Sequence, residues 1–345
     1  MAATTLPNEL RPRRLAGRAA RVAALIVALV LVALLAPGLD GVREELAGAD
    51  AGWLAVAVAL ELLSCISYVL MFRPVFCRNM SWRTSAEIGG AELGMGSIVP
   101  ASGIGGLALG AWILHRRGMD ADRIARRSVA FFLIKSSVNF MAVAVIGTLL
   151  AIGIVGPDLS LLLTALPAAL SIALILVVGA LPMIGRGDPA PSSAGRVRRG
   201  AAAARRAVVD GIGEARAIFR SPDPLIVVGA LGYWAFDNAV LWATFEALGE
   251  PPSMWIVLMG YLIGQLGGLL PIPGGVGGID GGLIGTLIVY GAPPEATAAA
   301  VLAYRLILFW LPLLIGALAL SALGRALRRP DRLDLQACTP IPADA

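Results

Sequence analysis

The stretch Leu270-Pro271-Ile272-Pro273-Gly274-Gly275-Val276-Gly277-Gly278-Ile279-Asp280 interrupts an apolar region that covers residues 254–290. Proline lacks the backbone N–H and glycine weakens a helix, so this stretch cannot continue a regular helix through a membrane. A similar stretch, Val99-Pro100-Ala101-Ser102-Gly103-Ile104-Gly105-Gly106, divides the apolar region 88–114. We therefore predict two broken, re-entrant helical hairpins, because irregular backbone at membrane depth must be buried in protein or face a wet cavity. The residues assigned to the breaks are Pro100, Gly103, Gly106, Pro271, Pro273, Gly274, Gly275, Gly277 and Gly278.

Six uninterrupted apolar runs accompany these two regions. Of the 345 residues, 58% are hydrophobic and 15% are charged. A run of about 20 apolar residues can cross the roughly 30 Å hydrocarbon core of a bilayer. The pattern predicts an all-α polytopic membrane protein with six full transmembrane helices and two re-entrant hairpins, in which the first run is a retained helix and not a signal peptide. The runs are 19–37, 52–72, 128–153, 159–184, 224–247 and 298–321.

The arginines predict the orientation of the chain. Of its 28 cationic residues, 27 are arginine, and 25 of these face one side if both broken regions are re-entrant. Cytoplasmic segments carry an excess of arginine and lysine, so we expect a multi-pass protein of the inner cell membrane with both termini in the cytoplasm. The formal net charge of +5 is explained by this orientation and by contact with anionic lipids, and not by nucleic acid. The stretches are 11–21, 73–83, 116–127, 186–220 and 325–332.

The whole chain, 1–345, is predicted to form a single transmembrane domain. It includes a basic cytoplasmic loop at 185–222 and disordered tails at 1–15 and 330–345. In the loop, Val208, Ile212, Ala215 and Phe219 recur at helical spacing, with arginines around the rest of the turn. This pattern fits an amphipathic helix on the inner leaflet and fits a solvated basic loop equally well.

Two parts of the chain, about 52–153 and 224–321, share one spacing of polar and helix-breaking residues. The separations are 176 residues for Glu61 and Asp237, 171 for Pro100 and Pro271, 172 for Gly106 and Gly278, and 170 for Lys135 and Arg305. With the orientation above, the two parts enter their broken segments from opposite sides and form an inverted repeat. Broken segments at matched positions of inverted repeats mark the substrate site of many transporters.

Buried charges give these parts their candidate site. Glu61, Lys135, Asp237, Asp280 and Arg305 lie within apolar segments, where each costs roughly 2.5–3.5 kcal/mol on insertion scales. One interpretation is a set of structural ion pairs: Arg305 with Asp280, and Lys135 with Glu61 or Glu92. The other is a site for a lipid headgroup, in which the cations bind a phosphate and the acids balance or relay charge. The candidate site residues are Arg305, Asp280, Lys135, Asp237, Glu61 and Glu92.

The sequence has few residues that could bind a metal or a cofactor. The chain has one histidine, His115, and three widely spaced cysteines. Neither a zinc site nor a Ser-His-Asp triad is expected from such a set. We predict no metal site, no cofactor and no catalytic residue.

The second half resembles the lysylphosphatidylglycerol synthase transmembrane-region family, also called the flippase-like domain. The resemblance rests on Leu270–Asp280, on Tyr290-Gly291-Ala292-Pro293 and on Ala303-Tyr304-Arg305-Leu306. The family's pattern is Pro-x-Gly-Gly-x-Gly, an acidic residue, a helix to a glycine, and an arginine in the next helix. The resemblance implies that Asp280 and Arg305 take the acidic and basic places, and that the chain moves lipids between leaflets.

The chain also departs from the family. The first hairpin usually carries Gly-Glu and an arginine soon after its proline, where this chain has Gly103-Ile104-Gly105-Gly106-Leu107-Ala108. Glu92 or Lys135 is a candidate replacement for that chemistry. The last predicted helix ends at residue 321 of 345, so the aminoacyl-transferase domain of larger members, and lipid synthesis with it, are not expected.

Three classes of function remain in view. The leading hypothesis is a transporter, not an enzyme, that flips an anionic-headgroup phospholipid or polyprenyl-phosphate-linked lipid through a polar cavity at the midplane. The alternatives are an intramembrane lipid-linked transferase and a structural accessory subunit. Membrane lipids are the expected partners; a homodimer and a separately encoded lipid-biosynthetic enzyme are further options.

Overall fold

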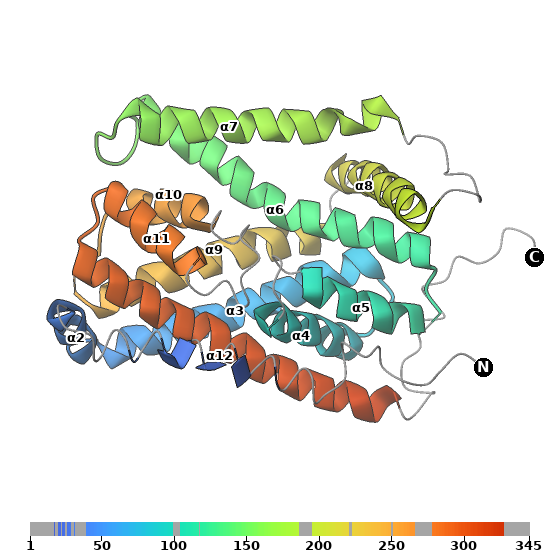
Figure 1. The fold of residues 1–345 in the computed structure, drawn as a ribbon, viewed down its shortest axis with the longest axis horizontal. Helices are drawn as coiled ribbons and strands as arrows, with labels where there is room; N and C mark the ends of the chain where they lie inside the picture. The colour runs from blue at the N-terminus through green and yellow to red at the C-terminus, as the bar shows by residue number, and fades with distance from the viewer. Residues whose placement is uncertain are drawn as a thin grey trace, which may run out of the picture. The chain divides into compact units, whose positions relative to one another are not determined.

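The computed structural model describes residues 17, 20–21, 23–24, 26–28, 31, 39–98, 104–116, 118–185, 195–220, 223–249, 251–265 and 278–327. Regular secondary structure in these ranges is helical throughout, and the described residues between 17 and 31 are helical as well. The prediction of an all-α polytopic membrane protein is confirmed (Figure 1). The helices are α2 (Asp40–Ala47), α3 (Ala51–Phe76), α4 (Trp82–Ile98), α5 (Ile104–Arg116), α6 (Ala121–Ala151), α7 (Leu161–Ala180), η2 (Leu181–Ile184), α8 (Arg196–Arg220), α9 (Pro224–Ala247), α10 (Met254–Gly264), α11 (Gly278–Val289) and α12 (Pro294–Leu327).

Five helices in the described part of the chain are long and apolar enough to cross a membrane. They are α3, α6, α7 with the start of η2, α9 and α12, and they match five of the six predicted runs. Their starts carry ordinary helix signals: Asp120 caps α6 by accepting a hydrogen bond from the Arg123 N–H at 3.0 Å, and Pro294 and Glu295 open α12. The remaining run, 19–37, lies mostly outside the described residues.

Both broken regions are divided into two helices. The first gives α4 and α5, and the second gives α10 and α11. At 1.5 Å per residue, the 11 to 13 residues of α5, α10 and α11 reach only about 16–20 Å, well short of a bilayer core. The stretches 99–103 and 266–277 lie outside the described residues, and with them the predicted break residues Pro100, Gly103, Pro271, Pro273, Gly274, Gly275 and Gly277.

The two remaining break residues are helical. Gly106 was expected to interrupt the helix, but it lies inside α5, and Gly278 is the first residue of α11. A helix tolerates single glycines, so Gly106 can lie within α5. A Cβ at Gly106 would collide with the backbone oxygen of Glu92, which shows that glycine here permits α5 to approach α4 closely.

The helix order repeats along the chain at a constant spacing. Helices α3, α4, α5 and α6 correspond in order to α9, α10, α11 and α12. Their first residues are separated by 173 residues (51 and 224), 172 (82 and 254), 174 (104 and 278) and 173 (121 and 294). Helices α7 and α8 lie between the two sets in the sequence.

The corresponding helices α5 and α11 also end alike. Gly118 and Gly291 have positive φ values of 92° and 99° and follow the last turn of each helix. At each end the glycine N–H bonds back to a carbonyl three residues earlier, at 3.0 and 2.9 Å, and the next N–H bonds back five residues, at 3.1 and 3.0 Å. This is the Schellman motif, which requires a left-handed residue and therefore favours glycine.

The chain forms two compact units. Unit 1 contains residues 1–65, 90–110 and 236–322, and unit 2 contains 66–89, 111–235 and 323–345. In unit 1, α10 packs against α11 through glycines, and a Cβ on Gly264 would lie 2.8 Å from the Leu283 Cα. A Cβ on Gly94 of α4 would lie 2.7 Å from the Gly316 Cα of α12. Such contacts bring helix backbones close together, as at many transmembrane helix interfaces.

Unit 2 contains an aromatic core and the helix α8 of the basic loop. The rings of Phe72, Phe76 and Phe131 are fully buried and lie 4.5–5.9 Å apart. Helix α6 packs against α7 and α8 (Figure 1). The basic loop therefore contains a helix over Arg196–Arg220, and Ile212 and Ala215 are its buried apolar residues. The other two residues of the predicted apolar stripe, Val208 and Phe219, are 40% and 49% exposed, and whether this helix lies on the inner leaflet stays a prediction.

Candidate functional site

An ion pair between Arg305 and Asp280 lies inside unit 1. Arg305 lies in the N-terminal half of α12 and Asp280 in the first turn of α11, and the Arg305 Nε lies 2.5 Å from the Asp280 Oδ1. The two side chains are 11% and 6% exposed. A charge buried this deeply is stable only with a partner, so the pair joins the two helices. The predicted pairing of these residues is confirmed.

Asp237 of α9 receives two phenol hydrogen bonds in the same unit. Tyr261 of α10 donates to its Oδ2, and Tyr304 of α12 donates to its Oδ1 at 3.3 Å. Asp237 is 9% exposed and Tyr304 is fully buried. Hydroxyl donors stabilise an ionised carboxylate, and they replace the water that a buried acid has lost.

Glu61 of α3 belongs to the same polar cluster but has poorer partners. Its Oε1 accepts a hydrogen bond from the Cys65 thiol at 3.6 Å, while its buried Oε2 accepts none from the described residues. Glu61 is 4% exposed and interacts electrostatically with Asp237. A thiol is a weak donor, so the Glu61 carboxyl is the least satisfied group of the cluster.

Tyr304 connects the parts of this arrangement. Its hydroxyl contacts Asp237, it interacts electrostatically with Glu61 and with Arg305, and its ring meets that of Tyr261 edge to face at 6.4 Å. Five helices thus contribute to one polar cluster in unit 1, which we call the α12 network. Its members are Glu61, Cys65, Asp237, Tyr261, Asp280, Tyr304 and Arg305.

The network contains more carboxylates than cations. Glu61, Asp237 and Asp280 stand against the single guanidinium of Arg305 among its members. Glu92, another candidate, is 2% exposed in α4 of the same unit, and its carboxyl lies where a Cβ on Gly110 would be. Lys135 belongs to unit 2, where its ammonium lies over the Tyr233 ring at 5.6 Å from the centroid. The predicted pairing of Lys135 with Glu61 or Glu92 stays a prediction.

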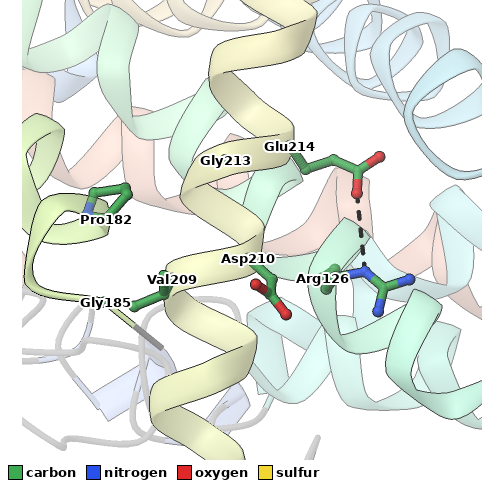
Figure 2. Close-up of a pocket in the computed structure, with 7 residues that line it drawn as sticks. All are labelled: Arg126, Pro182, Gly185, Val209, Asp210, Gly213 and Glu214. Carbon is green, nitrogen blue, oxygen red and sulfur yellow. Dashed lines mark ion pairs between the residues drawn. The ribbon is translucent and has the colours of Figure 1, made fainter. Parts of the chain in front are cut away.

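Unit 2 contains a pocket of about 750 Å³ beside α8 (Figure 2). Glu214 forms ion pairs there with Arg127 at 2.7 Å and with Arg126 at 4.0 Å, and Asp210 faces the same hollow. The pocket is polar and adjoins the helix of the basic loop, so it differs in character from the buried network of unit 1. Its other lining residues are Pro182, Gly185, Val209 and Gly213.

Comparison with known proteins identifies one matching family and several relatives. The family described as the lysylphosphatidylglycerol synthase TM region matches residues 21–316. The chain belongs to this family. Two UPF0104 membrane proteins of Methanothermobacter thermautotrophicus are 36% identical over 98 residues (28% of each chain) and 30% identical over 92 residues (26% of this chain, 27% of the relative). The matched segments span about a quarter of the length of these curated relatives.

The family match covers the residues of the α12 network. Sequence reasoning predicted the acidic and basic members, because charges in apolar runs are conspicuous. It missed Cys65, Tyr261 and Tyr304, because tyrosine and cysteine are common in apolar helices. One available signal was the adjacency of Tyr304 to Arg305 within a long apolar helix. Within the described residues no group of three or more His, Cys, Asp or Glu could hold a metal ion.

Proposed function

We propose that this member of the family flips a lipid with an anionic headgroup, a phospholipid or a polyprenyl-phosphate-linked lipid, between the leaflets of its membrane. The observation that carries the proposal is the buried ion pair of Arg305 and Asp280 within a polar network contributed by apolar helices. Intramembrane ionisable residues mark substrate or ion pathways in many membrane proteins. A lipid phosphate is the ligand that a guanidinium at this depth suits best.

Exchange of partners at Arg305 provides the mechanism. The guanidinium has five N–H donors in a planar fork, which can bind two oxygens of a phosphate at once. An entering headgroup repels the Asp280 carboxylate and takes its place on Arg305, so the guanidinium keeps an anionic partner throughout. When the headgroup leaves toward the other leaflet, Asp280 returns to Arg305. The lipid tails meanwhile stay in the hydrocarbon.

Alternating access fits a pair of inverted units. We infer that α4–α5 and α10–α11 are re-entrant hairpins of an inverted repeat over about 52–153 and 224–321. The constant spacing of 172–174 residues between corresponding helix starts supports this inference, as do the matching ends of α5 and α11. The arginine distribution supports an inner cell membrane with both termini in the cytoplasm.

Transport and not synthesis is the role we assign to this chain. Its partners in the proposal are membrane lipids, without nucleic acid, and a separately encoded enzyme would make any modified headgroup. A homodimer is compatible with this scheme. Glu92 is proposed to complete the headgroup site of the α12 network, and Lys135 stays the cation that the sequence predicts for the first half.

Reconstitution into liposomes tests the proposal. A panel of labelled anionic phospholipids and polyprenyl phosphates is scored for the fraction of label accessible from outside, with the wild-type chain and with Arg305→Gln. We expect at least one lipid of the panel to equilibrate faster than in protein-free vesicles, and Arg305→Gln to abolish that gain. If no lipid of the panel moves faster than in protein-free vesicles, the chain is not a flippase. If a folded Arg305→Gln chain flips as well as the wild type, the ion pair is only structural.

A further inference from the structure

The α12 network contains two buried carboxyl groups that the exchange at Arg305 does not use. Glu61 and Asp237 interact with each other electrostatically and are 4% and 9% exposed. Two carboxylates cannot both remain ionised at low cost where water is excluded, because like charges repel strongly in a low dielectric. The repulsion between the two carboxyl groups is removed if one of them binds a cation, such as a proton.

We propose that Glu61 binds and releases a proton during each transport cycle, so that an anionic lipid moves together with one proton. This inference rests on the proposed lipid transport and specifies its driving force. The proton enters from water on one side, bonds to Oε2 of Glu61 as the headgroup binds, and leaves to water on the other side as the headgroup departs. No other bond is made or broken.

The hydrogen bonds of the pair decide which carboxyl carries the proton. Asp237 accepts from Tyr261 and from Tyr304, and two phenol donors favour an ionised carboxylate. Among the described residues, Glu61 accepts only from the Cys65 thiol, and its buried Oε2 accepts no hydrogen bond from them. A protonated Oε2 needs no donor, whereas an ionised one lacks the donors that buried anions require.

The groups that face the pair are consistent with this assignment. Glu61 accepts a hydrogen bond from Cys65 of its own helix α3, and it interacts electrostatically with Asp237 of α9 and Tyr304 of α12. Arg305 acts on Tyr304 but forms its ion pair with Asp280 of α11, and Tyr261 of α10 donates to Asp237. The network thus has three acids and one guanidinium, and a headgroup with one negative charge increases this excess. One proton at Glu61 offsets the added charge.

Coupling to one proton changes what drives the lipid. A headgroup with one negative charge that moves with one proton carries no net charge across the membrane, so a membrane potential does not drive it. A gradient of one pH unit should then shift the equilibrium ratio of the lipid between leaflets about tenfold. Without the proton, a potential of about 100 mV acts on one charge with about 2.3 kcal/mol, which corresponds to roughly a fiftyfold shift.

The test uses the full chain in phosphatidylcholine vesicles with a trace of phosphatidylglycerol that is fluorescently labelled on an acyl chain. The label accessible to an external quencher at equilibrium is measured under a pH gradient with the potential clamped, and under a potential without a pH gradient. We expect the wild type to respond to the pH gradient and not to the potential. Glu61→Gln should lose the response to the pH gradient. Glu246→Gln, an acid of α9 outside the network, should keep it.

A wild-type chain that follows the potential and ignores the pH gradient would overturn proton coupling, and a response to a sodium gradient alone would do the same. Both results leave lipid transport intact. If no lipid moves under any condition, transport itself has failed, and infrared difference spectroscopy of the solubilised chain then decides the proton site by itself. The site stands if the wild type shows a protonated-carboxyl band that is missing from Glu61→Gln. It falls if the two spectra agree in that region.

Discussion

Tyr304 and Arg305 are adjacent on α12, yet they bind acids from two different helices. The Tyr304 hydroxyl donates to Asp237 of α9 at 3.3 Å, and the Arg305 Nε lies 2.5 Å from the Asp280 carboxylate of α11. One turn of α12 therefore holds the polar groups of two other helices. A change at either residue should affect both helix packing and any ligand exchange that opens the ion pair.

Removal of one partner of the ion pair is predicted to be more harmful than removal of both. Asp280→Asn leaves Arg305 without its carboxylate, and Arg305→Gln leaves Asp280 without its cation; breaking a buried pair in this way costs about 3–5 kcal/mol. The double variant Asp280→Asn with Arg305→Gln removes both charges and should recover much of the loss. Thermal unfolding in detergent measures these differences.

The double variant also separates a structural role from a functional one. Because it is uncharged at both positions, it should fold nearly as well as the wild type but fail to flip an anionic lipid. Equal flipping by the double variant and the wild type would contradict the role of Arg305 as the phosphate ligand.

The two tyrosines of the network are predicted to stabilise unit 1. Tyr261→Phe and Tyr304→Phe each remove one hydroxyl donor from Asp237 and keep the ring. A hydrogen bond to a charged group contributes about 1.5–3 kcal/mol, so each change should lower the free energy of unfolding by that order. Tyr304 donates at 3.3 Å, beyond the usual range of an O–H donor, and its loss should fall at the lower end.

A double-mutant cycle with Asp237→Asn checks whether the tyrosines act through this carboxylate. Tyr290→Phe serves as a control, because Tyr290 is a buried tyrosine that lies beyond the end of α11. If each tyrosine change costs the same in the wild-type chain and in the Asp237→Asn variant, the hydrogen bonds to this carboxylate contribute nothing specific.

Much of the fold could be predicted from the sequence because lipid imposes strict requirements on length and polarity. The runs that became α3, α6, α7, α9 and α12 stand out for this reason, and so do the charges of Asp280 and Arg305. The composition of the network could not be completed in the same way. Whether Tyr261 or Cys65 faces an acid depends on how each helix is rotated and packed. In an almost uniformly apolar helix, the periodicity of the sequence does not predict which face is turned toward the acid. Gly106 shows the same limit, since a glycine at a close helix contact resembles a glycine at a break.

The contact between α4 and α12 predicts a strong sensitivity to a single methyl group. A Cβ on Gly94 would lie 2.7 Å from the Gly316 Cα and 3.0 Å from the Pro312 oxygen, and backbone cannot move aside as a flexible side chain can. Gly94→Ala should therefore destabilise the chain by about 1–3 kcal/mol, the usual cost of overpacking. The measurement is the midpoint of thermal unfolding in detergent.

Gly285→Ala is the matched control for that change. Gly285 also lies inside a helix of unit 1, but a Cβ there would meet no atom of another described segment within 4 Å. Because alanine favours a helix over glycine by about 0.5–1 kcal/mol, Gly285→Ala should be neutral or stabilising. A similar loss in both variants would mean that the α4–α12 contact does not explain the result.

The attachment of α8 is predicted to depend on Arg127 more than on its neighbour Arg126. Both arginines pair with Glu214. Arg127 lies 2.7 Å from the carboxylate and also donates to the Val75 carbonyl at 2.8 Å. Arg126, which Figure 2 shows beside Glu214, lies at 4.0 Å. The three side chains are 24–37% exposed, so solvent weakens each ion pair, and we expect losses of about 1 kcal/mol or less for Arg126→Gln and more for Arg127→Gln.

Hydrogen exchange of α8 in detergent reports the change directly. We expect faster exchange in Arg127→Gln than in Arg126→Gln. Glu214→Gln removes the ion pair but keeps the hydrogen bond from Arg127 to Val75, so its effect should be smaller than that of Arg127→Gln and should shrink at high salt. The reverse order would contradict this ranking, and exchange equal to the wild type in all three variants would mean that Ile212 and Ala215 hold α8 against apolar neighbours without measurable help from the ion pairs.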